Sequence, residues 1–214
     1  VDICKTTTTP SLAVAELVLG LTLNLIRGIS FQNNDIKSGV WVKNMGSLLS
    51  KKTLGILGLG NIGKKVVEIS SGLNLDIVAY DENHDWQFAK KFNVKYLSFD
   101  EFLAKSDIIS IHLNLSKETK KIIDYEALKK MKKNSILINT SRGEIVDENS
   151  LIKALDNNII MGAGLDVYEN EPYSGSLLNY NNVICTPHIG AYAKEVRNKM
   201  ELEAVENLVN GLKK

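Results

Sequence analysis

Three polar residues stand where short apolar runs end in the second half of the chain, and their types suit proton transfer and carboxylate binding. His188 follows NVICTP, Glu171 follows GLDVYEN, and Arg142 follows SILINTS. Histidine titrates near neutral pH and can deliver a proton to a carbonyl oxygen, and a nearby carboxylate such as Glu171 favours its charged form. Arginine can hold a carboxylate with paired hydrogen bonds. The three residues together favour acid/base chemistry on a carboxylate-bearing substrate, although each alone also fits an ordinary loop residue.

The other two histidines are weaker candidates. His84 lies in the polar run DENHDW and is interpreted as a surface helix residue. His112 ends the run DIISIHL, where lining a cofactor cleft and a structural role are both open. The three histidines are widely separated and predict no metal site. Cys4 and Cys185 are also far apart, which predicts free thiols in a reducing compartment.

The elements that must position these residues begin at Thr53, where short β-rich runs start to alternate with helical patterns. Several of the runs are apolar on both faces, as strands buried between two helix layers are. The sequence therefore predicts an α/β fold with a doubly wound, mostly parallel sheet of about seven strands and helices on both faces. The expected strands are TLGIL, LDIVAY, VKYL, DIISIHL, SILINT, IMGAGLDV and NVICT. Ligands bind such sheets at the carboxyl ends of the strands, where the three candidate residues fall.

A glycine-rich turn follows the first of these strands. GLGNIG places Gly58, Gly60 and Gly63 at the GxGxxG spacing, and a helical pattern begins at about Asn61. Glycine here permits a tight turn, a close approach of backbone to a pyrophosphate, and close packing of helix on strand. Asp81 closes the second strand, where an acid can accept both ribose hydroxyls and would repel a 2′-phosphate. We therefore expect NAD rather than NADP; the alternative is a plain strand-to-helix turn with Asp81 as a helix cap.

Two helices are expected outside this alternation. The segment 10–29 is apolar on nearly every face, with Thr9 as its expected cap and Pro10 in its first turn. Such a helix must be buried, either under the sheet or against another subunit. At the other end, KEVRNKMELEAVENLVNGLKK predicts an amphipathic helix that runs to the terminus.

Composition excludes several classes of partner. The 214 residues are 44% apolar and carry a formal net charge of +1, with the lysines scattered along the chain. This predicts no nucleic-acid-binding arm and no membrane-surface patch. No apolar run is long enough to span a bilayer, and no signal peptide is visible, so we expect a cytoplasmic protein.

Four ordered stretches resemble one enzyme family. GLGNIG, NTSRGEIVDE, GLDVYENEP and TPHIG occur in the order found in the D-isomer-specific 2-hydroxyacid dehydrogenases, particularly their D-3-phosphoglycerate dehydrogenase branch, and the resemblance runs from Thr6 to Lys214. It implies that Arg142 binds the substrate carboxylate and polarises the carbonyl, that His188 is the acid/base, and that Glu171 orients and charges it. The implied reaction is reversible hydride transfer between NADH and a 2-keto acid.

The same resemblance assigns cofactor contacts residue by residue. It places Asn61 and Ile62 at the pyrophosphate within the Gly58 to Gly63 turn, and Asp81 on the adenosine ribose. Along the nicotinamide half it implies Leu113, Thr140, Ser141, Arg142, Asp166, His188 and Gly190. The sequence departs from the family pattern at Thr6 and Thr7, where Thr-Pro is common, at Lys51, where Gly is common, and at Asn114, where Pro is common.

The resemblance also bears on domain organisation. It implies that residues 1–214 form a dinucleotide-binding (Rossmann) domain, and that the N-terminal substrate domain and its C-terminal return are absent from this chain. We therefore expect the isolated chain to be at most weakly active, with the full-length protein as the enzyme. It further implies a homodimer that packs through the 10–29 helix.

Several functions stay open from the sequence. The leading expectation is oxidation of 3-phosphoglycerate, and the alternative within the same chemistry is a glyoxylate or hydroxypyruvate reductase. A non-catalytic, NAD-sensing protein similar to the C-terminal-binding corepressors keeps the same three polar residues. A bare dinucleotide-binding domain that regulates transport would need only the glycine turn.

Overall fold

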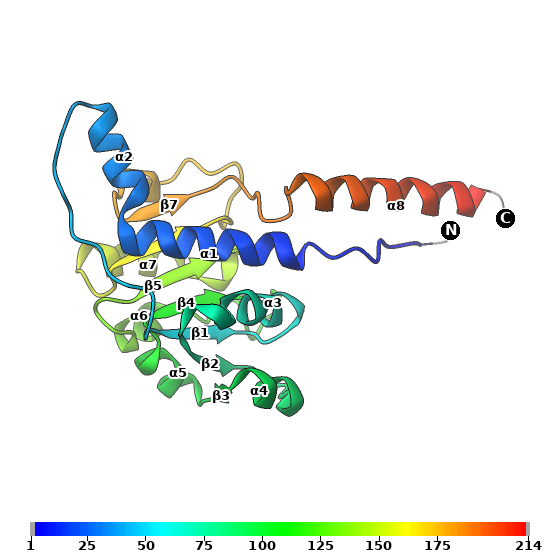
Figure 1. Cartoon of the computed structure of the whole chain (residues 1–214), viewed down its shortest axis with the longest axis horizontal. Helices are drawn as coiled ribbons and strands as arrows, with labels where there is room; N and C mark the ends of the chain where they lie inside the picture. The colour runs from blue at the N-terminus through cyan, green and yellow to red at the C-terminus, as the bar shows by residue number, and fades with distance from the viewer. Residues whose placement is uncertain (1–2, 213–214) are drawn as a thin grey trace.

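Seven parallel strands form the central sheet of the protein, seen in a computed structural model that describes residues 3–212 (Figure 1). The strands are β1 Thr53–Leu57, β2 Asp76–Tyr80, β3 Val94–Tyr96, β4 Ile108–Ile111, β5 Ile136–Asn139, β6 Gly162–Leu165 and β7 Val183–Cys185. Each pair of neighbours is parallel, so the predicted α/β sheet is confirmed. Residues 1, 2, 213 and 214 of the predicted 1–214 domain lie outside the described part.

The strand order creates a crevice at one edge of the sheet. The order is β3-β2-β1-β4-β5-β6-β7, so the chain runs outward from β1 in one direction and then returns to continue from β4 in the other. The loops after β1 and β4 therefore diverge at the carboxyl ends of the strands. Ligands of doubly wound sheets bind at this point of reversal.

Helices cover both faces of the sheet, and two further helices, α2 and α8, extend away from it (Figure 1). The helices are α1 Ser11–Arg27, α2 Ile29–Lys37, α3 Asn61–Ser70, α4 Trp86–Phe92, α5 Phe99–Lys105, α6 Tyr125–Lys130, α7 Glu148–Asp156 and α8 Lys194–Leu212. One buried cluster joins the sheet to α5, α6 and α7, and the other joins it to α1 and α3. Ile109 and Ile138 are fully buried in the central strands, and each such side chain contributes about 1.5 to 3 kcal/mol of burial free energy. This double coverage explains the continuous apolar strands in the sequence.

The predicted 10–29 helix is α1, and it ends at Gly28, whose φ of 59° stops the helix in the left-handed conformation. The expected cap at Thr9 is wrong. Pro10 occupies the cap position, and the hydroxyl of Thr9 accepts a hydrogen bond from the hydroxyl of Ser11 at 3.2 Å instead. One face of α1 is buried under the sheet, while Leu12 and Leu23 stay exposed.

An arm made of α2 and residues 38–48 extends from the body of the molecule (Figure 1). It carries exposed apolar side chains, among them Trp41 at 80% and Met45 at 101% exposure. The exposed side chains of the arm therefore form an apolar surface that no other part of residues 3–212 covers. Just after the arm, Lys51 adopts a φ of 64°, a conformation that favours glycine, and the resembled family commonly has Gly at this position.

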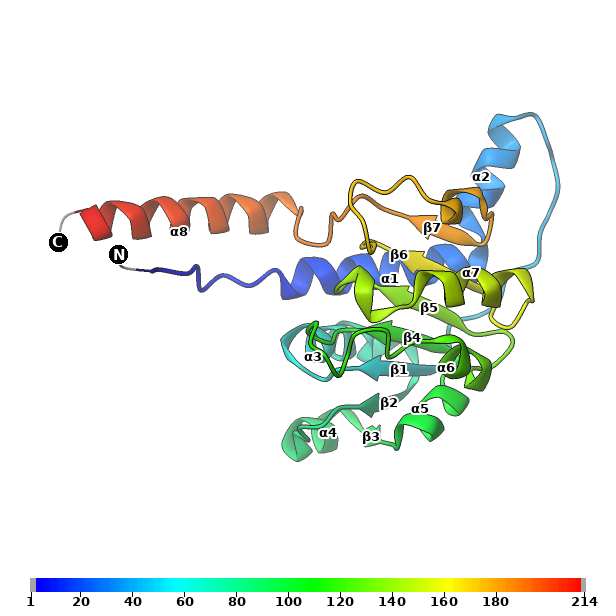
Figure 2. The ribbon, with the colours of Figure 1, turned by 180° about the vertical axis from the view of Figure 1, so that it is seen from behind.

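The C-terminal helix α8 confirms the helix expected there and runs away from the sheet beside the N-terminal segment (Figure 2). None of its described residues is buried. The carboxylate of Glu203 fastens the two segments by accepting hydrogen bonds from Thr7 and Thr8, and these bonds lower the pKa of Glu203 to about 2. Over the described residues, no single helix is long and apolar enough to cross a bilayer. Only α1 and α2 taken together meet that test, and they are bent by 62°.

Candidate active site

The glycine turn lies at the carboxyl end of β1, and its shape needs at least two of its three glycines. Gly58 has a φ of +97°, and a Cβ there would lie 2.9 Å from the carbonyl carbon of His112. A Cβ at Gly63 would lie 2.3 Å from the carbonyl oxygen of Gly58. A Cβ at Gly60 would meet nothing within 4 Å, so this position faces open space. The turn is therefore tightly packed on the protein side and open where a pyrophosphate would approach the start of α3 at Asn61.

Asp81 lies beside this turn and is held by backbone. Its carboxylate accepts hydrogen bonds from the N–H of Leu59 at 2.6 Å and from the N–H of Asn83 at 2.8 Å. The alternative that Asp81 caps the next helix is wrong, because Asp85 caps α4 by accepting from the N–H of Phe88 at 2.9 Å. Asp81 is thus positioned beside the glycine turn.

A cavity of about 530 Å³ opens at the same edge of the sheet. It brings together all the residues that the family resemblance placed along the nicotinamide half of the cofactor, and one that it placed at the pyrophosphate, Ile62. The nicotinamide-half residues are Leu113, Thr140, Ser141, Arg142, Asp166, His188 and Gly190. The cavity lining also includes Pro10 and Val14, which were not predicted because contact between α1 and the loops is tertiary, and Asn114, Leu115 and Ala191, which directly follow predicted residues in the sequence. Gly58, Gly60, Asn61, Gly63 and Asp81 are not part of this lining, nor is Glu171.

The polar atoms of the cavity fit a dinucleotide. Thr140 Oγ1 and His112 Nδ1 are buried and have no hydrogen-bond partner among the described residues. Buried polar groups in folded proteins are nearly always paired, so a ligand with hydroxyl, amide and phosphate groups suits them. Together with the open face at Gly60, these atoms make the edge of the sheet compatible with NAD.

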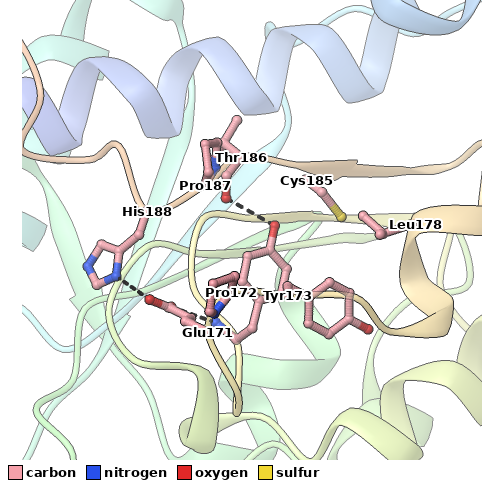
Figure 3. Close-up of a pocket in the computed structure, with 9 residues that line it drawn as sticks. Glu171, Pro172, Tyr173, Leu178, Cys185, Thr186, Pro187 and His188 are labelled. Atoms are coloured by element: carbon pink, nitrogen blue, oxygen red, sulfur yellow. Dashed lines mark hydrogen bonds and ion pairs between the residues drawn. The ribbon is translucent and has the colours of Figure 1, made fainter.

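His188 and Glu171 form a hydrogen-bonded pair (Figure 3). His188 Nδ1 lies 2.8 Å from Glu171 Oε2, and Glu171 Oε1 accepts from the backbone N–H of Tyr168 at 3.1 Å. Burial raises the pKa of Glu171, but the hydrogen bonds from His188 and Tyr168 and the nearby charge of Arg142 outweigh it, so this pKa lies below its usual value. Glu171 is therefore ionised at neutral pH, and His188 Nε2, which points away from Glu171 in Figure 3, is left to face a reactant.

The loop that carries His188 is held in an uncommon conformation. His188 has a φ of 55°, which costs about 1 to 2 kcal/mol for a residue other than glycine. The carboxylate of Asp166, only 1% exposed, accepts from the Thr186 hydroxyl at 2.6 Å and from the N–H groups of Ile189 and Gly190, both at 2.8 Å. Asp166 thus lines the cavity and also fixes the loop on both sides of His188.

Arg142 is positioned by the end of β5. The side chain of Asn139 donates to the carbonyl of Arg142 at 2.9 Å and accepts from the N–H of Ser141 at 3.1 Å. A Cβ at Gly143 would lie 1.9 Å from the carbonyl carbon of Tyr168, so glycine is needed for this turn to approach the segment before Glu171. Sequence reasoning missed Asn139 because it reads as the polar end of an apolar strand. The turn brings Arg142 to the cavity that His188 lines.

His84 and the two cysteines form no part of the His188–Glu171 pair. The expectation that His84 lies in a helix is wrong: α4 begins later, at Trp86, and the exposed His84 ring stacks on Tyr96 with centroids 4.1 Å apart. Cys4 and Cys185 are free thiols. Within residues 3–212, no group of three or more His, Cys, Asp and Glu residues is arranged to hold a metal ion.

His112 is a half-buried residue of the cavity lining with a neutral imidazole. Its Nε2 lies 2.8 Å from the hydroxyl of Ser110, and burial lowers the pKa of His112 to about 3. Below about pH 6.5, His112 binds a proton in the unfolded chain but stays neutral in the native protein. The unfolded state therefore gains relative stability as the pH falls from 6.5 toward 3.

This linkage predicts that His112→Gln reduces the acid sensitivity of the fold. Between pH 7 and pH 5, we expect the free energy of unfolding to fall by up to about 2 kcal/mol more in the unmodified protein than in the variant. Urea unfolding at the two pH values measures this difference. His84→Gln, which changes an exposed histidine, is the control, and an equal pH dependence in all three proteins would contradict the assignment.

Comparisons with known proteins agree with this geometry. Residues 19–190 match the family described as D-isomer specific 2-hydroxyacid dehydrogenase, NAD binding domain. The chain is 40% identical over 207 residues to a glyoxylate reductase of Thermococcus litoralis, a match that covers 92% of the chain and 62% of that relative. It is 34% identical over 210 residues to D-3-phosphoglycerate dehydrogenase 2, chloroplastic, of Arabidopsis thaliana, which covers 96% of the chain and 34% of that protein.

Solved structures are similar over almost the whole chain. The crystal structure of a glyoxylate reductase from Paecilomyes thermophila superposes with a TM-score of 0.88 at 35% sequence identity, covering 97% of this chain and 64% of that one. The chain thus spans less than two thirds of the length of these relatives. On sequence, fold and site geometry alike, the chain belongs to the D-isomer-specific 2-hydroxyacid dehydrogenase family and contains its NAD-binding domain.

Proposed function

We propose that the protein that carries this chain is an NAD-dependent oxidoreductase that interconverts a 2-keto acid and a D-2-hydroxy acid. The observation that carries this proposal is the His188–Glu171 pair at 2.8 Å, placed at the edge of the cavity that Arg142 also lines. A proton donor that can recharge near neutral pH and a carboxylate-binding cation are the two groups that keto-acid reduction requires of the protein.

Each of the three side chains has one task in this reaction. NADH, when bound, supplies a hydride to the carbonyl carbon. Arg142 binds the substrate carboxylate and orients the carbonyl, and His188 delivers the proton from Nε2 to the carbonyl oxygen. Glu171 stabilises the imidazolium before the transfer and lets it be recharged from water afterwards. The hydride forms the new C–H bond and the proton forms the O–H bond, so the keto group becomes a secondary alcohol or, from an aldehyde, a primary one.

Glyoxylate and hydroxypyruvate are the substrates that we propose first. The support is the 40% identity to the glyoxylate reductase of Thermococcus litoralis, against 34% to the D-3-phosphoglycerate dehydrogenase of Arabidopsis thaliana. Oxidation of 3-phosphoglycerate, the leading expectation from sequence, becomes the second candidate. Values of kcat/KM for the reduction of glyoxylate, hydroxypyruvate and 3-phosphohydroxypyruvate, measured on the full-length protein, decide between them. A higher value for 3-phosphohydroxypyruvate, the keto acid that corresponds to 3-phosphoglycerate, would reverse the order.

Asp81 is proposed to select NAD over NADP. Its carboxylate is fixed beside the glycine turn, where it would accept the ribose hydroxyls and repel a 2′-phosphate. We expect Asp81→Ala to reduce the preference for NADH over NADPH at least tenfold, as measured by fluorescence titration with each cofactor. Asp76→Ala, at the exposed opposite end of β2, should leave the preference unchanged. Equal affinities for NADH and NADPH in the unmodified protein would contradict the assignment.

We also propose that residues 1–214 act as the dinucleotide-binding domain, that turnover needs the full-length protein, and that this protein is cytoplasmic. The free thiols at Cys4 and Cys185 support the reducing compartment.

A homodimer through the 10–29 helix is supported by the exposed Leu12 and Leu23 of α1 and by the apolar arm that follows it. Light scattering should give twice the chain mass, and a monomeric mass would contradict the dimer.

A further inference from the structure

A second cavity, of about 560 Å³, opens beside the pair, and Figure 3 shows Glu171, His188 and Tyr173 in its lining. Tyr168 also lines this cavity. Its side chain is 8% exposed, and its ring stacks on Tyr173 with centroids 4.3 Å apart. This tyrosine is not among the expected cofactor contacts, and its side chain has no task in the proposed proton transfer. In the sequence it is only the last apolar residue of the run GLDVY.

Both polar groups of Tyr168 reach the segments that carry the pair. Its backbone N–H donates to Glu171 Oε1 at 3.1 Å, and the other oxygen of that carboxylate contacts His188. Its hydroxyl lies 3.0 Å from the carbonyl oxygen of Thr186 and 3.0 Å from that of Leu165, so the single proton is shared between the ends of β6 and β7. Burial raises the pKa of Tyr168, which keeps the hydroxyl protonated and able to donate.

The carbonyl of Thr186 links this hydroxyl to His188. It also accepts the backbone N–H of His188 at 3.1 Å, so Tyr168 and His188 meet on one oxygen. His188 itself has the left-handed φ of 55°, and its imidazole direction depends on whatever holds the preceding backbone. Asp166 holds this loop from the cavity side, and the tyrosine hydroxyl holds it from the other side.

We propose that Tyr168 is a positioning residue that aligns the His188 imidazole with the Glu171 carboxylate, through its hydroxyl on the backbone before His188 and its N–H on Glu171. The proposal rests on the proposed function, since alignment matters to turnover only if His188 transfers the proton. Tyr173 offers a matched control. It is the stacked neighbour in the same cavity, but its hydroxyl donates to Glu148 at 2.7 Å and does not reach the loop.

The test compares Tyr168→Phe with Tyr173→Phe in the full-length protein. The deciding measurement is the NMR titration of the His188 imidazole without cofactor, assigned by the histidine signal that His188→Ala removes. We expect Tyr168→Phe to shift this titration and to weaken its response to Glu171→Gln, while Tyr173→Phe leaves both unchanged. An unchanged titration in Tyr168→Phe, or an equal shift in both variants, would overturn the proposal.

Turnover gives a second readout. Tyr168→Phe should lower kcat about fivefold, the factor that corresponds to one hydrogen bond of about 1 kcal/mol, with the KM for NADH unchanged. A rise in the KM for NADH with kcat unchanged would count against alignment of the pair. Because the NMR titration needs no turnover, a shifted His188 signal in a protein that reduces no 2-keto acid would refute the proposed function and leave the alignment intact.

Discussion

Replacing His188 by alanine is expected to lower kcat of the full-length protein roughly 1,000-fold, with the affinity for NADH changed by no more than about threefold. The variant removes the proton donor, while Asp166 still holds the loop through the N–H groups of Ile189 and Gly190. The glycine turn and Asp81, which lie at β1 and β2, are untouched. Stopped-flow or steady-state NADH oxidation gives kcat, and fluorescence titration gives the NADH affinity.

His84→Ala is the control for this experiment, because His84 is exposed, stacks on Tyr96 and does not line the cavity that His188 lines. It should retain full kcat. A His188→Ala protein with unchanged turnover would refute the acid/base assignment. A loss confined to NADH affinity would instead show that His188 serves only as a cofactor contact.

Replacing Arg142 by glutamine is expected to lower kcat/KM for the keto acid roughly 1,000-fold. Two charge-assisted hydrogen bonds to the substrate carboxylate are lost, each contributing about 2 kcal/mol, and glutamine keeps much of the side-chain length. Arg142→Lys should recover only part of the loss, because an ammonium group does not present the paired donors of a guanidinium. Initial rates over a range of keto-acid concentrations measure the effect.

Arg197→Gln provides the matched control, since Arg197 pairs with Glu201 on the surface of α8 and does not line the cavity. Its kcat/KM should stay within about twofold of the unmodified protein. If Arg142→Gln raised the KM for NADH and left the keto-acid KM unchanged, the carboxylate-binding role would be wrong.

The sheet was predictable because its central strands are buried on both faces. Parallel strands between two helix layers are mostly apolar, and runs such as the one at Ile108–Ile111, where only Ser110 is polar, show this directly in the sequence. The glycine turn was predictable for a related reason, because close approaches at Gly58 and Gly63 exclude every other residue type. These features are set by local sterics and by burial.

The supporting contacts of the site could not be predicted in the same way. Asn139 and Tyr168 each end an apolar run, and their roles depend on which backbone atoms fold against them. The predictions for the cap of α1 and for His84 were wrong for the same reason. The hydroxyl of Thr9 accepts a hydrogen bond from Ser11, and the His84 ring stacks on Tyr96. Asp166 was predicted as a cofactor residue, but its hold on the His188 loop becomes visible only in three dimensions.

The most direct test of the account is the absorbance of NADH mixed with the full-length protein and a panel of 2-keto acids, with NADH binding measured in parallel. We predict that NADH is consumed with at least one of glyoxylate, hydroxypyruvate and 3-phosphohydroxypyruvate, and that consumption needs both His188 and Arg142. Tight NADH binding with no consumption in any mixture would contradict the account, and would indicate a protein that senses the cofactor without reacting it.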